Sequence, residues 1–169
     1  LEYALGVVAD ILNLRHVSEK VPEEFADIYP AEEYARSQRY LRTSTRFGLV
    51  CATWDLGILL TAWCAGGFAL LDLWCGRQTS SSLLQGVLFI GTLAAAKALL
   101  GLPFSIYGTF VLEQRFGFNR THWRTFLLDR VKGLGLAVLL GLPLLAAVLW
   151  FFDTTGAAAW LWCWAITVL

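Results

Sequence analysis

The stretch from Gly133 to Phe152 reads GLGLAVLLGLPLLAAVLWFF and contains no charged residue. A helix of about 20 mostly apolar residues is long enough to cross the hydrocarbon core of a bilayer. The stretch lacks the alternation of polar and apolar positions that a strand of a membrane barrel shows. Because only helices and closed barrels satisfy their backbone hydrogen bonds in lipid, it predicts a transmembrane helix.

Four other apolar stretches lie on either side of it. Those at 47–73 and 83–112 are long enough to span a bilayer, whereas those at 1–14 and 157–169 are shorter. The sequence therefore predicts an all-α, multi-pass transmembrane bundle with three complete spans and two partial ones. Because both ends of the chain lie inside apolar stretches, we expect the whole chain, 1–169, to be one domain of a longer protein.

The composition supports a membrane protein and excludes several other classes. Apolar residues make up 57% of the chain and charged residues 15%, whereas soluble domains contain roughly 25% charged residues. The formal net charge is zero, so the chain has no general attraction for nucleic acid. The four cysteines lie in or beside apolar stretches, where they behave as small buried side chains.

The basic residues are concentrated in two of the loops between the predicted spans. Loop 15–46 contains six of them and loop 113–132 contains five, whereas loop 72–82 contains only Arg77 and loop 153–156 contains none. By the positive-inside rule, we expect the two long loops to be cytoplasmic. The stretch at 157–169 should then return the chain to the cytoplasmic side.

The long loops are predicted to be helical in part. Pro30 followed by Ala-Glu-Glu is typical of a helix start, because proline fits the first turn and acidic side chains interact favourably with the helix dipole there. In the second loop, Asn119 or Thr121 could cap a helix that leads into the span at 133–152.

Two charged residues lie inside predicted spans. Asp55 and Lys97 both lie about 12–15 Å below the cytoplasmic surface, if a helix rises about 1.5 Å per residue. A charge that faces lipid is costly, so we expect both side chains to face the interior of the bundle. The two residues could form an ion pair that fixes the helix register, or line a polar cavity, or take part in a proton relay.

No motif for catalysis or metal binding occurs in the chain. His16 and His122 are the only histidines, and neither has a second histidine at the spacing of a zinc site. No Gly-rich phosphate loop, catalytic Ser/His/Asp order or paired-carboxylate motif stands out in the sequence. We therefore predict no catalytic residue, no metal ligand and no bound zinc in this chain.

The segment 102–121, LPFSIYGTFVLEQRFGFNRT, resembles the N-terminal membrane domain of the type I CAAX prenyl protease family. The most specific part is FGFN followed by a basic residue and threonine, at the end of a predicted span. Four shorter segments are also similar to that family: LNLRH at 12–16, VPEEF at 21–25, EYARS at 33–37 and FLLDRVK at 126–132. The similarity thus extends over nearly the whole chain.

The resemblance implies a longer zinc metalloendopeptidase with about seven spans around a water-filled chamber. Two histidines of an HExxH helix and a later glutamate would hold the zinc, and the glutamate of the motif would act as general base. This catalytic domain is expected after residue 169, on the cytoplasmic side. The implied partners of the chain are membrane lipid, its own C-terminal domain, and a peptide or protein substrate with a prenylated or otherwise membrane-associated C-terminus.

The resemblance also suggests a role for the loop that follows the span at 83–112. Its candidate contact residues are Glu113, Arg115, Phe116, Phe118 and Asn119. Two exposed phenylalanines would be a liability in a solvated loop, so they could either cover the local helix ends or dock against the catalytic domain.

Two other functions are compatible with the same sequence. In a small transporter or channel subunit, Asp55 and Lys97 would lie on the permeation path. In a non-catalytic scaffold, the membrane domain would remain without a protease. An HExxH motif within about a hundred residues after position 169 would favour the protease.

Overall fold

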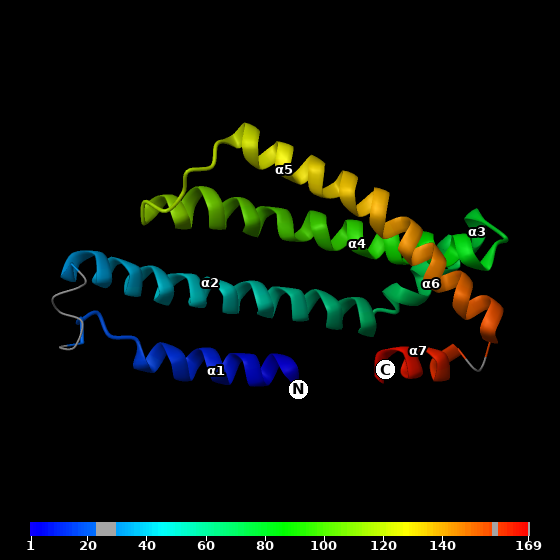
Figure 1. The fold of residues 1–169 in the computed structure, drawn as a ribbon, viewed down its shortest axis with the longest axis horizontal. Coiled ribbons are helices and arrows are strands. Elements are labelled where there is room, and N and C mark those ends of the chain that lie inside the picture. Colours follow the sequence, from blue (N-terminus) through cyan, green and yellow to red (C-terminus); the bar gives the residue numbers. More distant parts are fainter. Residues whose placement is uncertain (23–29, 157–158, 169) are drawn as a thin grey trace. The chain divides into compact units, whose positions relative to one another are not determined.

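The computed structural model describes residues 1–22, 30–156 and 159–168, and all regular structure in these ranges is helical. The elements are α1 (Glu2–His16), α2 (Ala31–Cys64), α3 (Gly67–Gln78), α4 (Ser82–Tyr107), the π-helical η2 (Gly108–Glu113), α5 (Trp123–Leu136), the π-helical η3 (Ala137–Gly141), α6 (Leu142–Thr155) and α7 (Ala159–Val168) (Figure 1).

Within the described residues, three helical stretches are long and apolar enough to cross a membrane. They are Ala31–Cys64, Ser82–Glu113 and Trp123–Thr155, with 34, 32 and 33 residues. A helix of this length extends about 50 Å, which exceeds the hydrocarbon core of about 30 Å. The structure thus confirms the predicted all-α, multi-pass membrane fold and indicates that the helices extend beyond the hydrocarbon core.

The helix starts and ends differ in part from those predicted. The expected helix start after Pro30 is confirmed, because α2 begins at Ala31 and the Tyr34 N–H donates to the Pro30 carbonyl over 3.1 Å. The predicted continuous span 47–73 is instead divided into α2 and α3. Gly66 has a φ of 70°, a left-handed value that glycine adopts readily and that ends a regular helix.

The chain divides into two compact units. One unit comprises residues 1–64 and 101–121, and the other comprises residues 65–100 and 122–169. The boundary falls within α4, so its last turns belong to the first unit.

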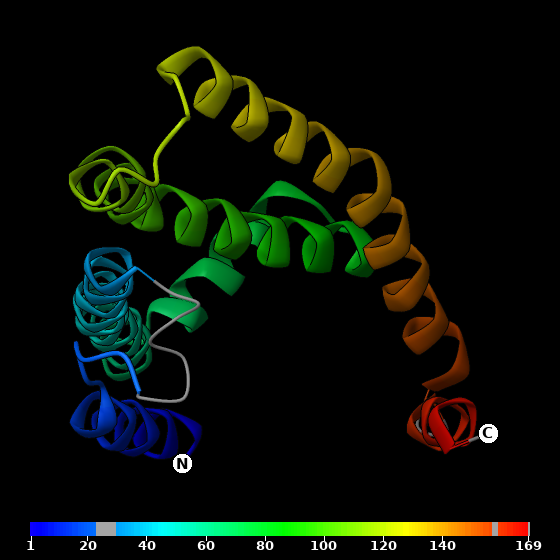
Figure 2. The same cartoon turned by 60° about the vertical axis from the view of Figure 1, so that its left-hand side comes forward.

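In the first unit, α1 lies beside α2, as Figures 1 and 2 both show. The Tyr3 hydroxyl and the Thr53 Oγ1 are 2.7 Å apart. At the other end of α1, the Arg42 side chain donates to the Val17 carbonyl over 3.1 Å. Because residue numbers fall along one helix as they rise along the other, the two helices are antiparallel.

Aromatic rings connect α2 to the C-terminal turns of α4. The Phe47 ring lies 5.2 Å from the Tyr107 ring and 6.3 Å from the Phe104 ring, measured between centroids. Trp54, two turns further along α2, lies 5.6 Å from Phe104. The α2 helix and the end of α4 therefore pack side by side through large apolar side chains.

In the second unit, α5, η3 and α6 form one continuous helical stretch (Figure 2). Pro143 lies in the first turn of α6, directly after the π-helical turn. Proline has no N–H to donate to the carbonyl four residues earlier, so a regular α-helix cannot keep its full set of hydrogen bonds here. The wider π-helical turn lies where this bond would be missing.

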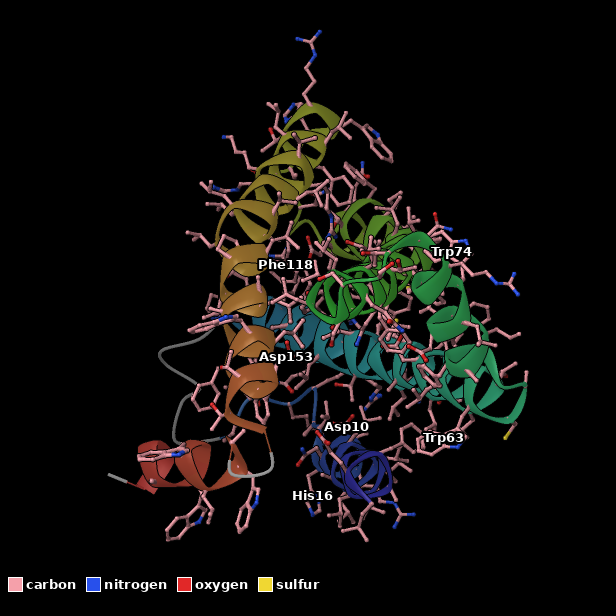
Figure 3. All side chains as sticks on the ribbon, turned by 90° about the vertical axis from the view of Figure 1, so that its right-hand side faces the viewer. Asp10, His16, Trp63, Trp74, Phe118 and Asp153 are labelled. Atoms are coloured by element: carbon pink, nitrogen blue, oxygen red, sulfur yellow. The ribbon has the colours of Figure 1, made fainter. Side chains whose placement is uncertain are left out.

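Few side chains are buried inside the chain itself. Among the described residues, only Cys75, Leu112 and Ala159 are buried. Large apolar side chains are exposed instead: Trp63 is 72% exposed and Trp74 is 49% exposed (Figure 3). Such surfaces are stable only in contact with lipid or with further protein.

Candidate functional site

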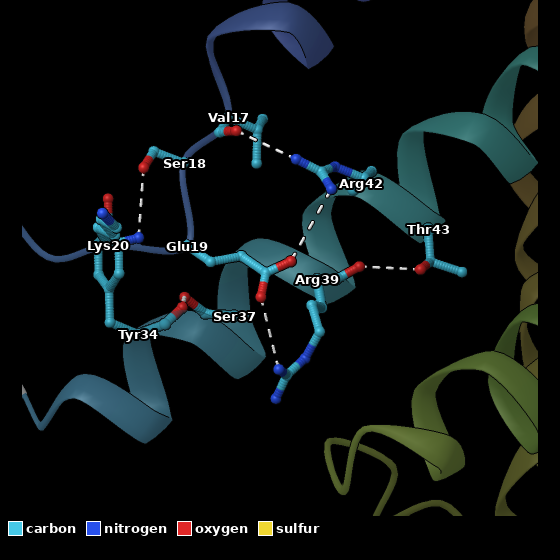
Figure 4. A network of polar contacts seen from close by, with 9 residues as sticks. All are labelled: Val17, Ser18, Glu19, Lys20, Tyr34, Ser37, Arg39, Arg42 and Thr43. Atoms are coloured by element: carbon cyan, nitrogen blue, oxygen red, sulfur yellow. Dashed lines mark hydrogen bonds and ion pairs between the residues drawn. The ribbon is translucent and has the colours of Figure 1, made fainter.

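A polar network in the first unit links the segment after α1 to α2. The Glu19 carboxylate lies 3.5 Å from the Arg39 guanidinium and 3.8 Å from that of Arg42 (Figure 4). Exposed ion pairs of this kind each contribute about 0–1 kcal/mol to stability. Together with the Arg42–Val17 hydrogen bond, the network holds this segment against α2.

The loop at 113–121, which belongs to the segment that resembles the protease family, forms a compact turn after η2. The Phe118 N–H donates to the Glu113 carbonyl over 2.9 Å, and the Gly117 N–H donates to the Gln114 carbonyl over 3.1 Å. This pair of bonds is a Schellman motif, which requires a left-handed residue after the last helical residue. Gly117 supplies it with a φ of 75°.

Asn119 stabilises the next turn rather than the following helix. Its side-chain oxygen accepts a 2.6 Å hydrogen bond from the Thr121 N–H. The α5 helix begins only at Trp123, and its N-cap residue, His122, makes no side-chain cap. The expectation that Asn119 or Thr121 caps this helix is therefore wrong, because the asparagine forms its own Asx turn before the helix begins.

The two phenylalanines of the loop pack against Tyr40 of α2. The Tyr40 ring centroid lies 5.5 Å from that of Phe116 and 4.8 Å from that of Phe118, both edge-to-face. The guanidinium carbon of Arg36 lies 5.9 Å from the Phe118 ring centroid. We call these four residues the Tyr40 cluster.

The Tyr40 cluster was not predicted from the sequence. Arg36 and Tyr40 are four residues apart, so they lie on the same face of α2 and can reach the same loop. This spacing could have indicated that the two side chains share a binding partner, but nothing in the local sequence pattern identifies the loop as that partner. Phe116 is half-buried, whereas Phe118 keeps 45% of its surface exposed.

Replacing Gly117 with alanine should destabilise this turn by about 1 kcal/mol, because an L-residue with a side chain rarely adopts a left-handed backbone. A Cβ at Gly117 would meet no atom within 4 Å, so the cost is in the backbone alone. Melting in detergent measures the effect. Gly48→Ala, in the interior of α2 with equally open surroundings, should be neutral or stabilising. Equal melting temperatures for the two variants would contradict the assignment.

The charged residues of the predicted spans lie in different units. Asp55 is on α2 in the first unit, and Lys97 is on α4 in the second; both side chains are exposed within this chain. Their ion pair stays a prediction from the sequence. Of the other predicted contact residues, Glu113 is the last residue of η2, and Arg115 lies exposed two residues after it.

The part of the chain that the structure describes offers no group of three or more His, Cys, Asp or Glu side chains that could hold a metal ion. Cys51, Cys64 and Cys75 are free thiols.

The helices and the loop define a multi-pass α-helical membrane domain. The chain belongs to the family described as CAAX prenyl protease N-terminal, five membrane helices, which matches residues 10–169. The resemblance found in the sequence is thereby confirmed.

Several relatives support this assignment. The chain is 29% identical to a CAAX prenyl protease 1 homolog of Arabidopsis thaliana over 154 residues, covering 86% of this chain and 36% of that protein. It is 40% identical to CAAX prenyl protease 1 of Saccharomyces cerevisiae over 73 residues, which is 43% of this chain and 16% of that protein. The crystal structure of S. mikatae Ste24p matches with a TM-score of 0.85 at 25% identity, over 99% of this chain and 41% of that one. The chain thus spans about a third of the length of most of the curated relatives it matches.

Proposed function

We propose that this chain is the N-terminal membrane domain of a zinc metalloendopeptidase that cleaves proteins near prenylated or otherwise membrane-associated C-termini. The observation that carries the proposal is the family match over residues 10–169, together with relatives that are named CAAX prenyl proteases. The domain would form the wall of a chamber in the membrane and support a catalytic domain that follows it.

The zinc would belong to that following domain. The described residues contain no cluster that fits a metal ion, so we assign this chain no step of the hydrolysis. Its contribution is to position the helices and to keep the reaction at the membrane. Loops 15–46 and 113–132 would face the cytoplasm, as the concentration of basic residues suggests.

The loop at 113–121 is the proposed contact with the catalytic domain. Phe118 supports this role because 45% of its surface stays exposed even though its ring packs on Tyr40. An exposed aromatic ring held in one position is suited to fill a pocket on a partner. Phe116 and Asn119 would hold the turn, while Glu113 and Arg115 would make polar contacts at the rim of the chamber.

The test uses the full-length protein reconstituted in vesicles with a farnesylated peptide that ends in a CAAX sequence. We expect release of the C-terminal residues, loss of this activity with a zinc chelator, and recovery when Zn²⁺ is restored. The same peptide without the farnesyl group measures how far cleavage depends on the lipid. If the folded, zinc-loaded protein cleaved neither peptide, the proposal would be wrong, and solute flux across the vesicles would then favour a transporter.

A further inference from the structure

Tyr40 has a specific place in the first unit. It lies on α2, yet its ring contacts both phenylalanines of a loop that follows η2 (4.8 and 5.5 Å between centroids). Phe47, two turns further along the same helix, also contacts two rings, but these belong to α4 itself. Tyr40 therefore contacts the loop, whereas Phe47 contacts α4.

The loop has little freedom while these contacts exist. Its backbone is closed by the bonds to the Glu113 and Gln114 carbonyls, and Gly117 allows the reversal of direction. Those bonds fix the local shape of the turn but not its direction relative to α2. The rings of Phe116 and Phe118, on either side of Gly117, both meet Tyr40, so the direction depends on that residue.

Arg36 adds a second contact from the same face of α2. Its guanidinium lies over the Phe118 ring, where the negative face of the ring attracts a cation. Residues of α2 thus cover one side of Phe118, and 45% of its surface is exposed.

We infer that Tyr40 is a positioning residue for the protease: it holds the loop 113–121 so that the free side of Phe118 meets the catalytic domain. The inference rests on the proposed function, because it assumes that domain. Tyr40 itself touches neither substrate nor metal in this role. It acts through the loop, as a side chain of α2 that sets the direction in which the loop points.

The test compares Tyr40→Leu with Phe47→Leu in the full-length protein. Each substitution removes two ring contacts from α2, so both should lower the melting temperature by a similar amount. Only Tyr40→Leu should speed amide hydrogen exchange at Gly117, Phe118 and Asn119, by about tenfold or more, and lower kcat for the farnesylated peptide by about tenfold. Tyr40→Phe keeps the ring and should restore both values.

A double replacement provides the second arm. Phe118→Leu should lower kcat as Tyr40→Leu does, and the two together should lower it little more than either alone, because both remove the same arrangement. Independent, multiplying effects would overturn the inference. It would also be overturned by a Tyr40→Leu variant with unchanged loop exchange, or with faster exchange and unchanged kcat.

These experiments also distinguish a failure of the positioning role from a failure of the proposed function. If the unmodified full-length protein cleaves no farnesylated peptide, the proposed function is wrong and the role of Tyr40 falls with it. If it does cleave the peptide, but Tyr40→Leu and Phe47→Leu lower kcat equally, only the positioning role is wrong. Tyr40 would then be one packing residue among several.

Discussion

Replacing Lys97 with leucine should destabilise the full-length protein more than replacing Lys97 with leucine and Asp55 with asparagine together. The two residues carry opposite charges at similar depth in their predicted spans, so we propose that they pair inside the bundle. The single replacement would leave a carboxylate alone in the membrane interior, at a cost of about 2.5–3.5 kcal/mol on insertion scales. The double replacement removes both charges and most of that cost.

Thermal melting in detergent would measure the difference between these variants. Asp55→Asn alone serves as the reciprocal control, because it should leave Lys97 without its partner and show a loss of similar size. If the double variant melted at the lowest temperature of the three, the two residues would not form an ion pair. A role in lining a water-filled cavity would then explain both charges better.

Replacing Gly86 with leucine should destabilise the second unit by about 1–3 kcal/mol, the usual cost of overpacking. Gly86 lies on α4 against α6, and a Cβ at this position would be 2.9 Å from the Leu149 Cδ1 and 3.7 Å from its Cγ. The end of the leucine can move to accept one methyl group, so Gly86→Ala should have a small effect. A full leucine side chain exceeds the space that this movement provides.

Gly91→Leu is the matched control, because it lies on the same helix and a Cβ there would meet no atom within 4 Å. It should melt close to the unmodified protein. An open cavity of about 400 Å³ lies beside Gly86 and is lined by Asp72, Gln85 and Phe89 among others. If Gly86→Leu melted like Gly91→Leu, the new side chain would have entered that cavity, and the close contact with Leu149 would not limit stability.

The membrane helices could be predicted because their signal is local. The apolar stretch 133–152 predicted a span by its length and lack of charge, and the structure has a helical stretch, Trp123–Thr155, that contains it. The break at Gly66 was missed because the apolar side chains continue across it, so hydrophobicity alone could not reveal a left-handed backbone. The π-helical turns were missed for a related reason, since the sequence on either side remains apolar.

The contact loop could be predicted only in part. The motif at 102–121 identified the residues, and Gly117 between two phenylalanines is compatible with the turn that the structure shows. The predicted helix cap at Asn119 was wrong, because its side chain bonds to Thr121 within the loop instead. The side-chain oxygen of an asparagine can accept a backbone hydrogen bond either in a helix cap or in an Asx turn, and the two have similar sequence signals.

Local features of the sequence were sufficient to predict the class of protein. Long, mostly apolar stretches without polar alternation predict helices in a bilayer, and the FGFN motif at 116–119 indicated the family. The side-chain contacts, such as those of Tyr40 with Phe118 and of Glu19 with Arg39, became known only from the three-dimensional structure. These residues lie far apart in the chain, and their contacts depend on how antiparallel helices align. Many weak packing contacts together determine that alignment, so it cannot be predicted from a local pattern of residues.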